Sequence, residues 1–287
     1  KFTWEPGRFG WATTLAQAFH LTHDEKYAEF FWQQFELFNQ HNPANMGPHW
    51  SSAQEVALRL ICWAFAWQVL KDAKATTAER EEALSTAIAK HAHRIPPTLM
   101  YARAQNNNHL LTEAAGLFTA ACIVPEHPNA RDWLDLGWQT INEGLQEQIA
   151  DDGAFIQHSN NYHRLMLQTA LWVQIQQDYT GHSFPAETLK SLKTSTIWLL
   201  GLLDAVTGSV PNLGPNDGAY ILPLTTQPFA DYRPVLQAAA YSFIGAKAFE
   251  DGPWNDMLCW FAPECNQSGQ NITTVHANRV DSASSWG

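Results

Sequence analysis

The chain lacks the features that would indicate a membrane protein or a disordered one. No apolar run reaches the ~18 residues that a membrane-spanning helix requires. Only 16% of the 287 residues are charged and 45% are hydrophobic, which is enough apolar surface for one large core or two modest ones. We therefore expect a folded globular protein with no membrane partner.

Cysteine is scarce, and no pair of the four cysteines has the spacing of a zinc motif. We expect no metal and no other cofactor. Cys62 and Cys122 lie inside apolar stretches and are expected to be small core residues. Cys259 and Cys265 are near enough in sequence to form a local disulfide in an oxidising compartment, a question that the sequence leaves open.

Basic residues are also few. Seventeen Lys and Arg against 28 Asp and Glu give a formal net charge of -11, and the isoelectric point is near 5.5. This charge gives no support to a nucleic-acid partner and should repel a polyanion. Aromatic residues, in contrast, are abundant: thirteen Trp and fifteen Phe either fill a large core or line a carbohydrate cleft, and composition alone favours the core.

Strand-like alternation is nearly absent, and apolar residues recur at three- and four-residue spacing instead. Helix-start signals include Asp24, Ser52 with Glu55, and Thr77. The pattern predicts ten helices, over residues 10–20, 24–40, 51–71, 77–93, 107–124, 129–150, 161–179, 185–205, 234–249 and 252–261. Helices joined by short polar links pack as antiparallel hairpins, and about five hairpins can curl into an incomplete α/α toroid. We predict an all-α domain of this kind over residues 1–264, and a tail or the start of another domain at 265–287.

Two polar clusters precede apolar helices. Residues 105–113 contain three consecutive Asn followed by His109. One Asn could cap the following helix, but three exceed what a cap needs. Residues 158–164 (HSNNYHR) repeat the pattern with a Tyr and an Arg. We expect the two clusters to face one cleft.

Five segments carry a resemblance to a known family: FTWEPGRFGWATTL at 2–15, WSSAQEVALRLICW at 50–63, NNHLLTEAA at 107–115, HSNNYH at 158–163 and PNLGPNDG at 211–218. In these segments the chain resembles the N-terminal helical domain of the bacterial heparinase II/III-like polysaccharide lyases, which are related to alginate lyases of the same architecture. The resemblance implies a toroid followed by a β-sandwich domain, and cleavage of uronate-containing polysaccharides by β-elimination. It also implies a periplasmic or secreted protein with two partners, an acidic polysaccharide substrate and a C-terminal β-sandwich domain that this chain lacks.

Elimination beside a uronate requires removal of the C5 proton, which the negative carboxylate opposes. Neutral or cationic donors aimed at the developing oxyanions stabilise the transition state more than the ground state. The resemblance assigns this role to Asn108 and His109. The alternative is that Asn108 only caps the helix and His109 is a half-buried side chain with ordinary hydrogen bonds.

Tyr162 matches the catalytic tyrosine of the family, which takes the C5 proton as phenolate and returns a proton to the bridging oxygen as phenol. An unperturbed Tyr has a pKa near ~10, so the phenolate requires nearby positive charge or good donors. His158, His163 and Arg164 are the local candidates, and we also expect them to bind substrate. The resemblance implies a further catalytic His in the β-sandwich domain, to which no residue here corresponds.

Other residues are candidates for supporting roles. Arg103 either grips a substrate carboxylate or belongs to an ordinary ion pair. His49 and Trp50 lie in a predicted loop and are expected to stack on or hydrogen-bond to sugar. Glu55 and Arg59 are one helical turn apart, which indicates a structural pair beneath the cleft.

Two other functions fit the same sequence. A glycoside hydrolase on an α/α barrel would use paired carboxylates, for which Asp151, Asp152 and Asp217 are available. A non-catalytic glycan-binding module would bind a polysaccharide without cleaving it.

The acidic net charge restricts the lyase hypothesis. The lyase hypothesis requires positive charge in the cleft. This charge comes either from Arg8, Arg103, Arg164 and the His residues gathered there, or from cations of the second domain. A weakly charged polysaccharide with isolated uronates suits this chain better than a densely sulfated one.

Overall fold

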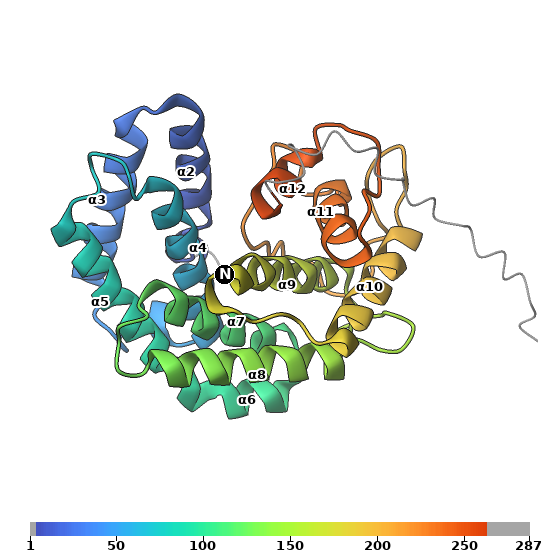
Figure 1. The fold of residues 1–287 in the computed structure, drawn as a ribbon, viewed down its shortest axis with the longest axis horizontal. Helices are drawn as coiled ribbons and strands as arrows, with labels where there is room; N and C mark the ends of the chain where they lie inside the picture. Colours follow the sequence, from blue (N-terminus) through green and yellow to red (C-terminus); the bar gives the residue numbers. More distant parts are fainter. Residues whose placement is uncertain (1–3, 263–287) are drawn as a thin grey trace, which may run out of the picture.

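The computed structural model describes residues 4–262, and every regular element within this range is a helix (Figure 1). The α-helices are α1 (Trp4–Gly7), α2 (Gly10–Thr22), α3 (Glu25–His41), α4 (Ala53–Leu70), α5 (Ala78–Arg94), α6 (Leu99–Gln105), α7 (Asn108–Ile123), α8 (Ala130–Gln148), α9 (Asn160–Thr180), α10 (Ala186–Gly201), α11 (Arg233–Ile244) and α12 (Asn255–Phe261), with 3-10 helices η1 (Pro48–Trp50) and η2 (Pro96–Thr98). All ten predicted helices are present. The sequence did not predict the short helices α1 and α6, of four and seven residues.

The helices form two rows along an arc (Figure 1). In the inner row α2, α4, α7, α9 and α11 contact one another in that order. In the outer row α3 packs on α2, α5 on α4, α8 on α7, and α10 on α9 and α11. This arrangement confirms the prediction of an all-α protein and matches an incomplete α/α toroid. At the far end of the arc, Trp260 of α12 reaches the rings of His20 and Phe65, with centroids 5.2 and 5.4 Å away.

The inner helices differ from the outer ones in their sequence pattern. Almost every residue of α7 is buried, whereas α3 and α5 bury one face and expose polar residues on the other. Contact between inner helices is close, since a Cβ added to Gly116 of α7 would lie 2.7 Å from the Cβ of Ala57 in α4. The starts of α4, α7 and α9 are thereby held side by side by a tightly packed core.

Some sequence predictions fall partly or wholly outside residues 4–262. The domain boundary near residue 264, the tail at 265–287 and the Cys259–Cys265 disulfide stay predictions. Cys62 is buried and Cys122 packs at the edge of the core, and burial raises the pKa of both thiols to about 12. In the described part of the chain, no helix combines the length and hydrophobicity needed to cross a membrane.

Candidate active site

The first turn of α7 carries a buried amide donor that no group of residues 4–262 uses. Asn107 is the N-cap, and its Oδ1 accepts a hydrogen bond from the backbone N–H of His109 at 3.0 Å. The alternative in which Asn108 caps the helix is therefore wrong. The Asn108 side chain is only 2% exposed, and its Nδ2 has no hydrogen-bond partner in the described structure. A buried unpaired donor is costly, and a ligand that reaches it would offset that cost. Asn161 Nδ2, in the first turn of α9, is a second buried donor without a partner among the described residues.

The first turn of α9 is bound to the loop that follows α10. Ser159 is the N-cap: its Oγ accepts from the N–H of Tyr162 at 3.2 Å and donates to the carbonyl of Pro215 at 2.6 Å. The Nδ2 of Asn160 donates to the carbonyl of Pro211 at 2.7 Å. These bonds hold the loop over the start of α9.

The two polar clusters lie next to each other, and the cleft that they were expected to share stays a prediction. The side-chain Oε1 of Gln157, just before α9, accepts a hydrogen bond from the backbone N–H of Asn108 at 2.9 Å. Both His109 and Tyr162 interact electrostatically with the same two residues, Arg8 and Glu55. The starts of α4, α7 and α9 therefore form one site.

Arg8 and Glu55 form a bidentate ion pair at the centre of this site. Arg8 Nε lies 2.6 Å from Glu55 Oε2, and Nη2 lies 2.7 Å from Oε1. The two side chains are 12% and 4% exposed. Because each charge neutralises the other, the pair supplies little net positive charge to a substrate.

Tyr162 is half-buried beside Asp217, which the loop after α10 supplies. Burial, followed by the negative charge of Asp217 and a hydrogen bond to it, raises the pKa of Tyr162 to about 12. The Arg8 guanidinium acts in the opposite direction but does not prevail. Tyr162 is therefore a neutral phenol at neutral pH.

His109 is also neutral at this site. Burial lowers the pKa of His109 below its usual range, and Arg8 adds to this effect, while Glu55 opposes it. A neutral imidazole still has one N–H to donate to a carboxylate.

The predicted Glu55–Arg59 pair is wrong, because Glu55 binds Arg8 instead. Arg59 is buried and donates hydrogen bonds to His91 Nε2 and to the carbonyls of Gly7 and His49, each at 2.9 Å. Burial lowers the pKa of Arg59 to about 9. Arg59 therefore holds α1 and η1 in place beneath the site.

His163 and Arg164 do not occupy positions suited to binding substrate. His163 is 1% exposed, lies 2.7 Å from Ser195 Oγ through Nε2 and stacks on Trp198, and burial lowers its pKa to about 4. Arg164 is fully buried and donates to Asn161 Oδ1 at 3.0 Å. Successive helical residues point about 100° apart, so Tyr162 faces the site while these two face the core.

Arg164, which lies on α9, holds the loop that carries Asp217. Its guanidinium lies over three aromatic rings, those of Tyr220, Phe229 and Tyr232, at 4.6, 4.0 and 4.3 Å from the centroids. These cation–π contacts fix the C-terminal half of the loop against α9.

The side chains of Arg103 and Trp50 also bind other groups of the protein. Arg103 is exposed on α6 and pairs with Glu143 at 2.7 Å and Glu147 at 3.4 Å, which is the ordinary ion pair that the sequence left open. Trp50 is 4% exposed and donates from Nε1 to the carbonyl of Asn42 at 3.2 Å. A buried indole does not fit the predicted stacking on sugar.

His158 and His49 keep access to solvent. His158 is exposed immediately before α9, at a left-handed φ of 48°. His49 is half-buried, and its Nδ1 has no hydrogen-bond partner among the described residues. Their predicted contacts with substrate stay predictions.

The carboxylates proposed for a hydrolase are used differently. Asp151 and Asp152 lie in an exposed turn after α8, where Asp152 Oδ1 accepts from the N–H of Ala154 at 2.9 Å. Asp217 has Tyr162 and Arg8 as its neighbours. Within residues 4–262, no three His, Cys, Asp or Glu side chains lie close enough to hold a metal ion.

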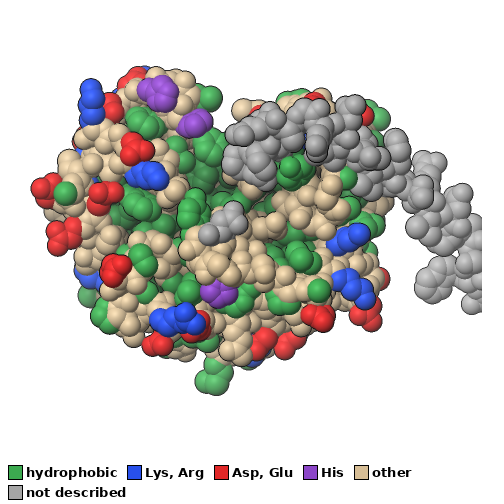
Figure 2. Space-filling view, in the orientation of Figure 1, with side chains coloured by type: hydrophobic (Ala, Val, Ile, Leu, Met, Phe, Trp, Pro, Cys, Tyr) green, Lys and Arg blue, Asp and Glu red, His purple; other side chains and the backbone are tan. Residues whose placement is uncertain are grey.

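Charged side chains of both signs are distributed around the face shown in Figure 2. Hydrophobic side chains line the notch between the α2–α3 side and the α11–α12 side. The basic residues that the lyase hypothesis required do not cluster: Arg8 lies at the site, Arg103 on the surface and Arg164 in the core.

Sequence reasoning underestimated Arg8 and Asp217. Arg8 was considered only for its charge, because its partner Glu55 is 47 positions away. Asp217 was considered only as a hydrolase carboxylate. Both lie in segments that carry the family resemblance, and that is the signal by which they could have been found.

A family model agrees with the resemblance. Residues 1–204 match the model described as Heparinase II/III N-terminus. The chain therefore belongs to this family.

Two curated relatives are also similar to this chain. The chain is 29% identical over 159 residues to heparin-sulfate lyase of Bacteroides thetaiotaomicron, covering 54% of this chain and 22% of the relative. It is 23% identical over 221 residues to heparin-sulfate lyase of Bacteroides stercoris, covering 69% and 32%. The chain thus spans between a fifth and a third of the length of these relatives.

Among solved structures, heparinase III superimposes with a TM-score of 0.62 at 20% identity, over 84% of this chain and 36% of that one. A mutant of heparan sulfate lyase HepC from Pedobacter heparinus gives 0.60 at 17% identity, over 95% and 40%. At these identities the likeness shows the fold.

Proposed function

We propose that the protein to which this chain belongs is a polysaccharide lyase that cleaves uronate-containing glycans by β-elimination. The observation that carries the proposal is that His109 and Tyr162 both interact with the Arg8–Glu55 pair, with Asn108 next to His109 at the start of α7. Membership of the Heparinase II/III N-terminus family supports it. The names of the relatives support a lyase, and the substrate of this protein is part of the proposal.

Asn108 and His109 would bind the uronate carboxylate. The unpaired Nδ2 of Asn108 and the N–H of neutral His109 lie at the N-terminus of α7, where the helix dipole also favours an anion. As the C5 proton leaves, negative charge moves onto the carboxylate oxygens and these hydrogen bonds strengthen. Neutral donors suit a weakly charged polysaccharide, because Arg8 is already neutralised by Glu55.

Tyr162 would be both base and acid. As phenolate it takes the C5 proton; the electrons of that bond form the C4–C5 double bond, and the bond from C4 to the bridging oxygen breaks. The same residue, now a phenol, gives its proton to the departing oxygen. Because the pKa of Tyr162 is about 12, the phenolate is the minor form at neutral pH and increases about tenfold with each pH unit.

The proposal includes parts outside this chain. We expect a C-terminal β-sandwich domain to supply a catalytic His and the opposite wall of the cleft. We also expect the protein to be periplasmic or secreted, where it would meet a polymeric substrate.

The test uses the full-length protein and a panel of uronate polysaccharides that differ in linkage and sulfation. The proposal predicts new ultraviolet absorbance from unsaturated sugar ends with at least one weakly charged member of the panel. New reducing ends without this absorbance would indicate a hydrolase, and binding without any new ends would indicate a glycan-binding module. Either result would reject the lyase proposal.

A further inference from the structure

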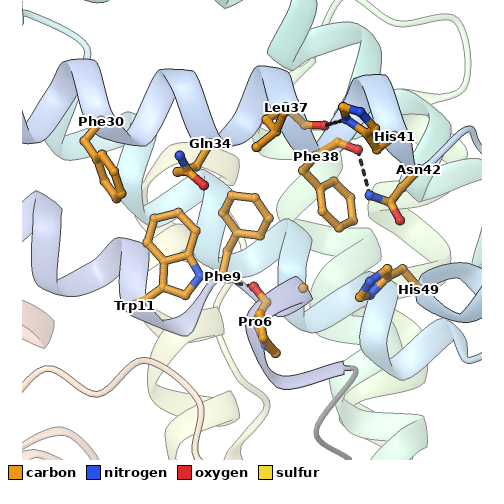
Figure 3. A pocket seen from close by; sticks show the side chains of 11 residues that line it. Pro6, Phe9, Trp11, Phe30, Gln34, Leu37, Phe38, His41, Asn42 and His49 are labelled. Carbon is orange, nitrogen blue, oxygen red and sulfur yellow. Dashed lines mark hydrogen bonds between the residues drawn. The ribbon is translucent and has the colours of Figure 1, made fainter.

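An aromatic pocket lies beside α1. It is bounded by α1, α2, α3 and η1 and has a volume of about 640 Å³, within the range of small-molecule sites. The rings of Phe9, Trp11, Phe30 and Phe38 line it (Figure 3). None of its lining residues is Asp, Glu, Lys or Arg.

Two of the four rings are held in place by the protein itself. Trp11 Nε1 donates to the carbonyl of Pro6 at 3.1 Å. Phe9 contacts the rings of Phe38 and Trp63 at centroid distances of 5.3 and 5.4 Å. Phe9 also has a left-handed backbone, with φ 61°, which is unusual for a bulky residue and is kept only where the surroundings enforce it. Phe9 and Trp11 are therefore preorganised.

Polar atoms accompany the rings. The Gln34 side chain points among them (Figure 3), and no hydrogen bond from its amide to another described residue is found. Asn42 Nδ2 donates to the carbonyl of Phe38 at 2.9 Å, which leaves Asn42 Oδ1 to accept. Apolar faces with a few amide groups match a pyranose, whose C–H face is apolar and whose hydroxyls donate and accept.

A second pocket contains charged side chains, which the first pocket lacks. That pocket lies between α3 and α5, has a volume of about 510 Å³ and is lined by Glu36, Glu79, Glu82 and Lys90. A charged sugar loses hydration in a pocket without countercharges, whereas a neutral one does not incur this cost.

We infer that the aromatic pocket binds a neutral sugar residue of the polysaccharide whose uronate is held at α7. The inference rests on the proposed function for the identity of that polysaccharide. Gly7 lines the pocket and Arg8, the next residue, lies at the candidate active site. Arg59 fixes the shared wall through its bonds to the carbonyls of Gly7 and His49.

Binding to the pocket can be measured without catalysis. The full-length protein carrying Tyr162→Phe is titrated with cellotetraose and N,N′-diacetylchitobiose as neutral probes and with glucuronic acid as the charged one, by calorimetry or NMR. Trp11→Ala and Phe30→Ala are expected to weaken neutral-sugar binding at least tenfold, and Gln34→Ala about threefold. The control Leu21→Ala, an exposed residue of α2 outside the pocket, should leave it unchanged.

Circular dichroism identifies any variant that fails to fold. Phe30 and Gln34 are partly exposed, so Phe30→Ala and Gln34→Ala are expected to fold and test the inference if Trp11→Ala does not. Failure of both neutral probes to bind, or binding that these variants do not change, overturns the inference. Glucuronic acid competing for the same site with equal affinity also overturns it. Neither result affects the lyase proposal, which depends on unsaturated products from the unmodified protein.

Discussion

The first turns of α7 and α9 carry similar residues but use them differently. In α7 the Asn108 amide is buried without a partner, and His109 is half-buried. In α9 Asn160 binds the loop after α10 through Nδ2, and Asn161 accepts from Arg164 through Oδ1. Asn161 Nδ2 is buried without a partner among the described residues, as Asn108 Nδ2 is. The two helix starts differ in that the Asn160 and Asn161 side chains also bind the scaffold that positions Tyr162.

The difference shows that an Asn-rich helix start is not by itself a site. One residue caps each helix, Asn107 in α7 and Ser159 in α9. What distinguishes α7 is that the Asn108 side chain makes no hydrogen bond to the described residues, whereas Asn160 and Asn161 each make one. Substitutions at Arg8, Asn108, Asn161, Asp217 and Arg103 test this comparison.

The largest expected effect follows from removing Arg8, which lies beside both helix starts. Arg8→Met leaves the Glu55 carboxylate buried without a partner, so we expect the free energy of unfolding to fall by about 3–5 kcal/mol. The double variant Arg8→Met with Glu55→Gln should recover more than half of that loss. Urea denaturation measures both values, and equal stability of the single and double variants would show that the pair is not coupled.

The next effect separates the two Asn clusters. Asn108→Ala should lower kcat by about 10²–10³ and the free energy of unfolding by less than about 1 kcal/mol, because its Nδ2 has no protein partner. Asn161→Ala should lower the free energy of unfolding by about 1.5–3 kcal/mol, because the buried Arg164 loses an acceptor. Kinetics and urea denaturation of both variants of the full-length protein test this difference. A large loss of stability in Asn108→Ala with unchanged kcat would refute the role of Asn108 in binding the carboxylate.

Asp217→Asn should shift the pH dependence of catalysis. The Asp217 carboxylate contributes to the raised pKa of Tyr162, so its neutralisation lowers that pKa and makes the phenolate more abundant at a given pH. We expect kcat/KM to rise with pH in the unmodified protein, and the Asp217→Asn profile to lie about one pH unit lower. A shift to higher pH would contradict Tyr162 as the base.

The smallest effect concerns Arg103, whose exposed ion pairs with α8 leave it no role at the site. Arg103→Ala should change the free energy of unfolding by less than about 1 kcal/mol and KM by less than about twofold. A tenfold rise in KM would restore the predicted grip on a substrate carboxylate.

Helix number and order could be predicted because the segments are long and periodic and their start signals are local. Asp24 and Thr77 cap α3 and α5 through their side chains, as expected. At Ser52 the same signal was misleading: the helix starts there, but the Ser makes no capping bond and Glu55 binds Arg8 instead.

The candidate site could be predicted only in part, because its contacts join distant segments. The adjacency of the two Asn clusters followed from both lying at helix starts. The neighbours of Tyr162 did not follow, since sequence proximity suggested His163 and Arg164, whereas helical rotation turns both toward the core. Arg8 and Asp217 lie in distant segments of the sequence, on either side of Tyr162, and only the tertiary fold brings the three together.

The proposed β-elimination depends most on Tyr162, because this residue takes and returns the proton. In the full-length protein, with the polysaccharide that gives the most unsaturated product, Tyr162→Phe should lower the rate by about 10²–10⁴ while substrate binding stays within a few-fold. Tyr179→Phe, an exposed tyrosine near the other end of α9, should leave the rate unchanged. More than half of the activity remaining in Tyr162→Phe would contradict the account.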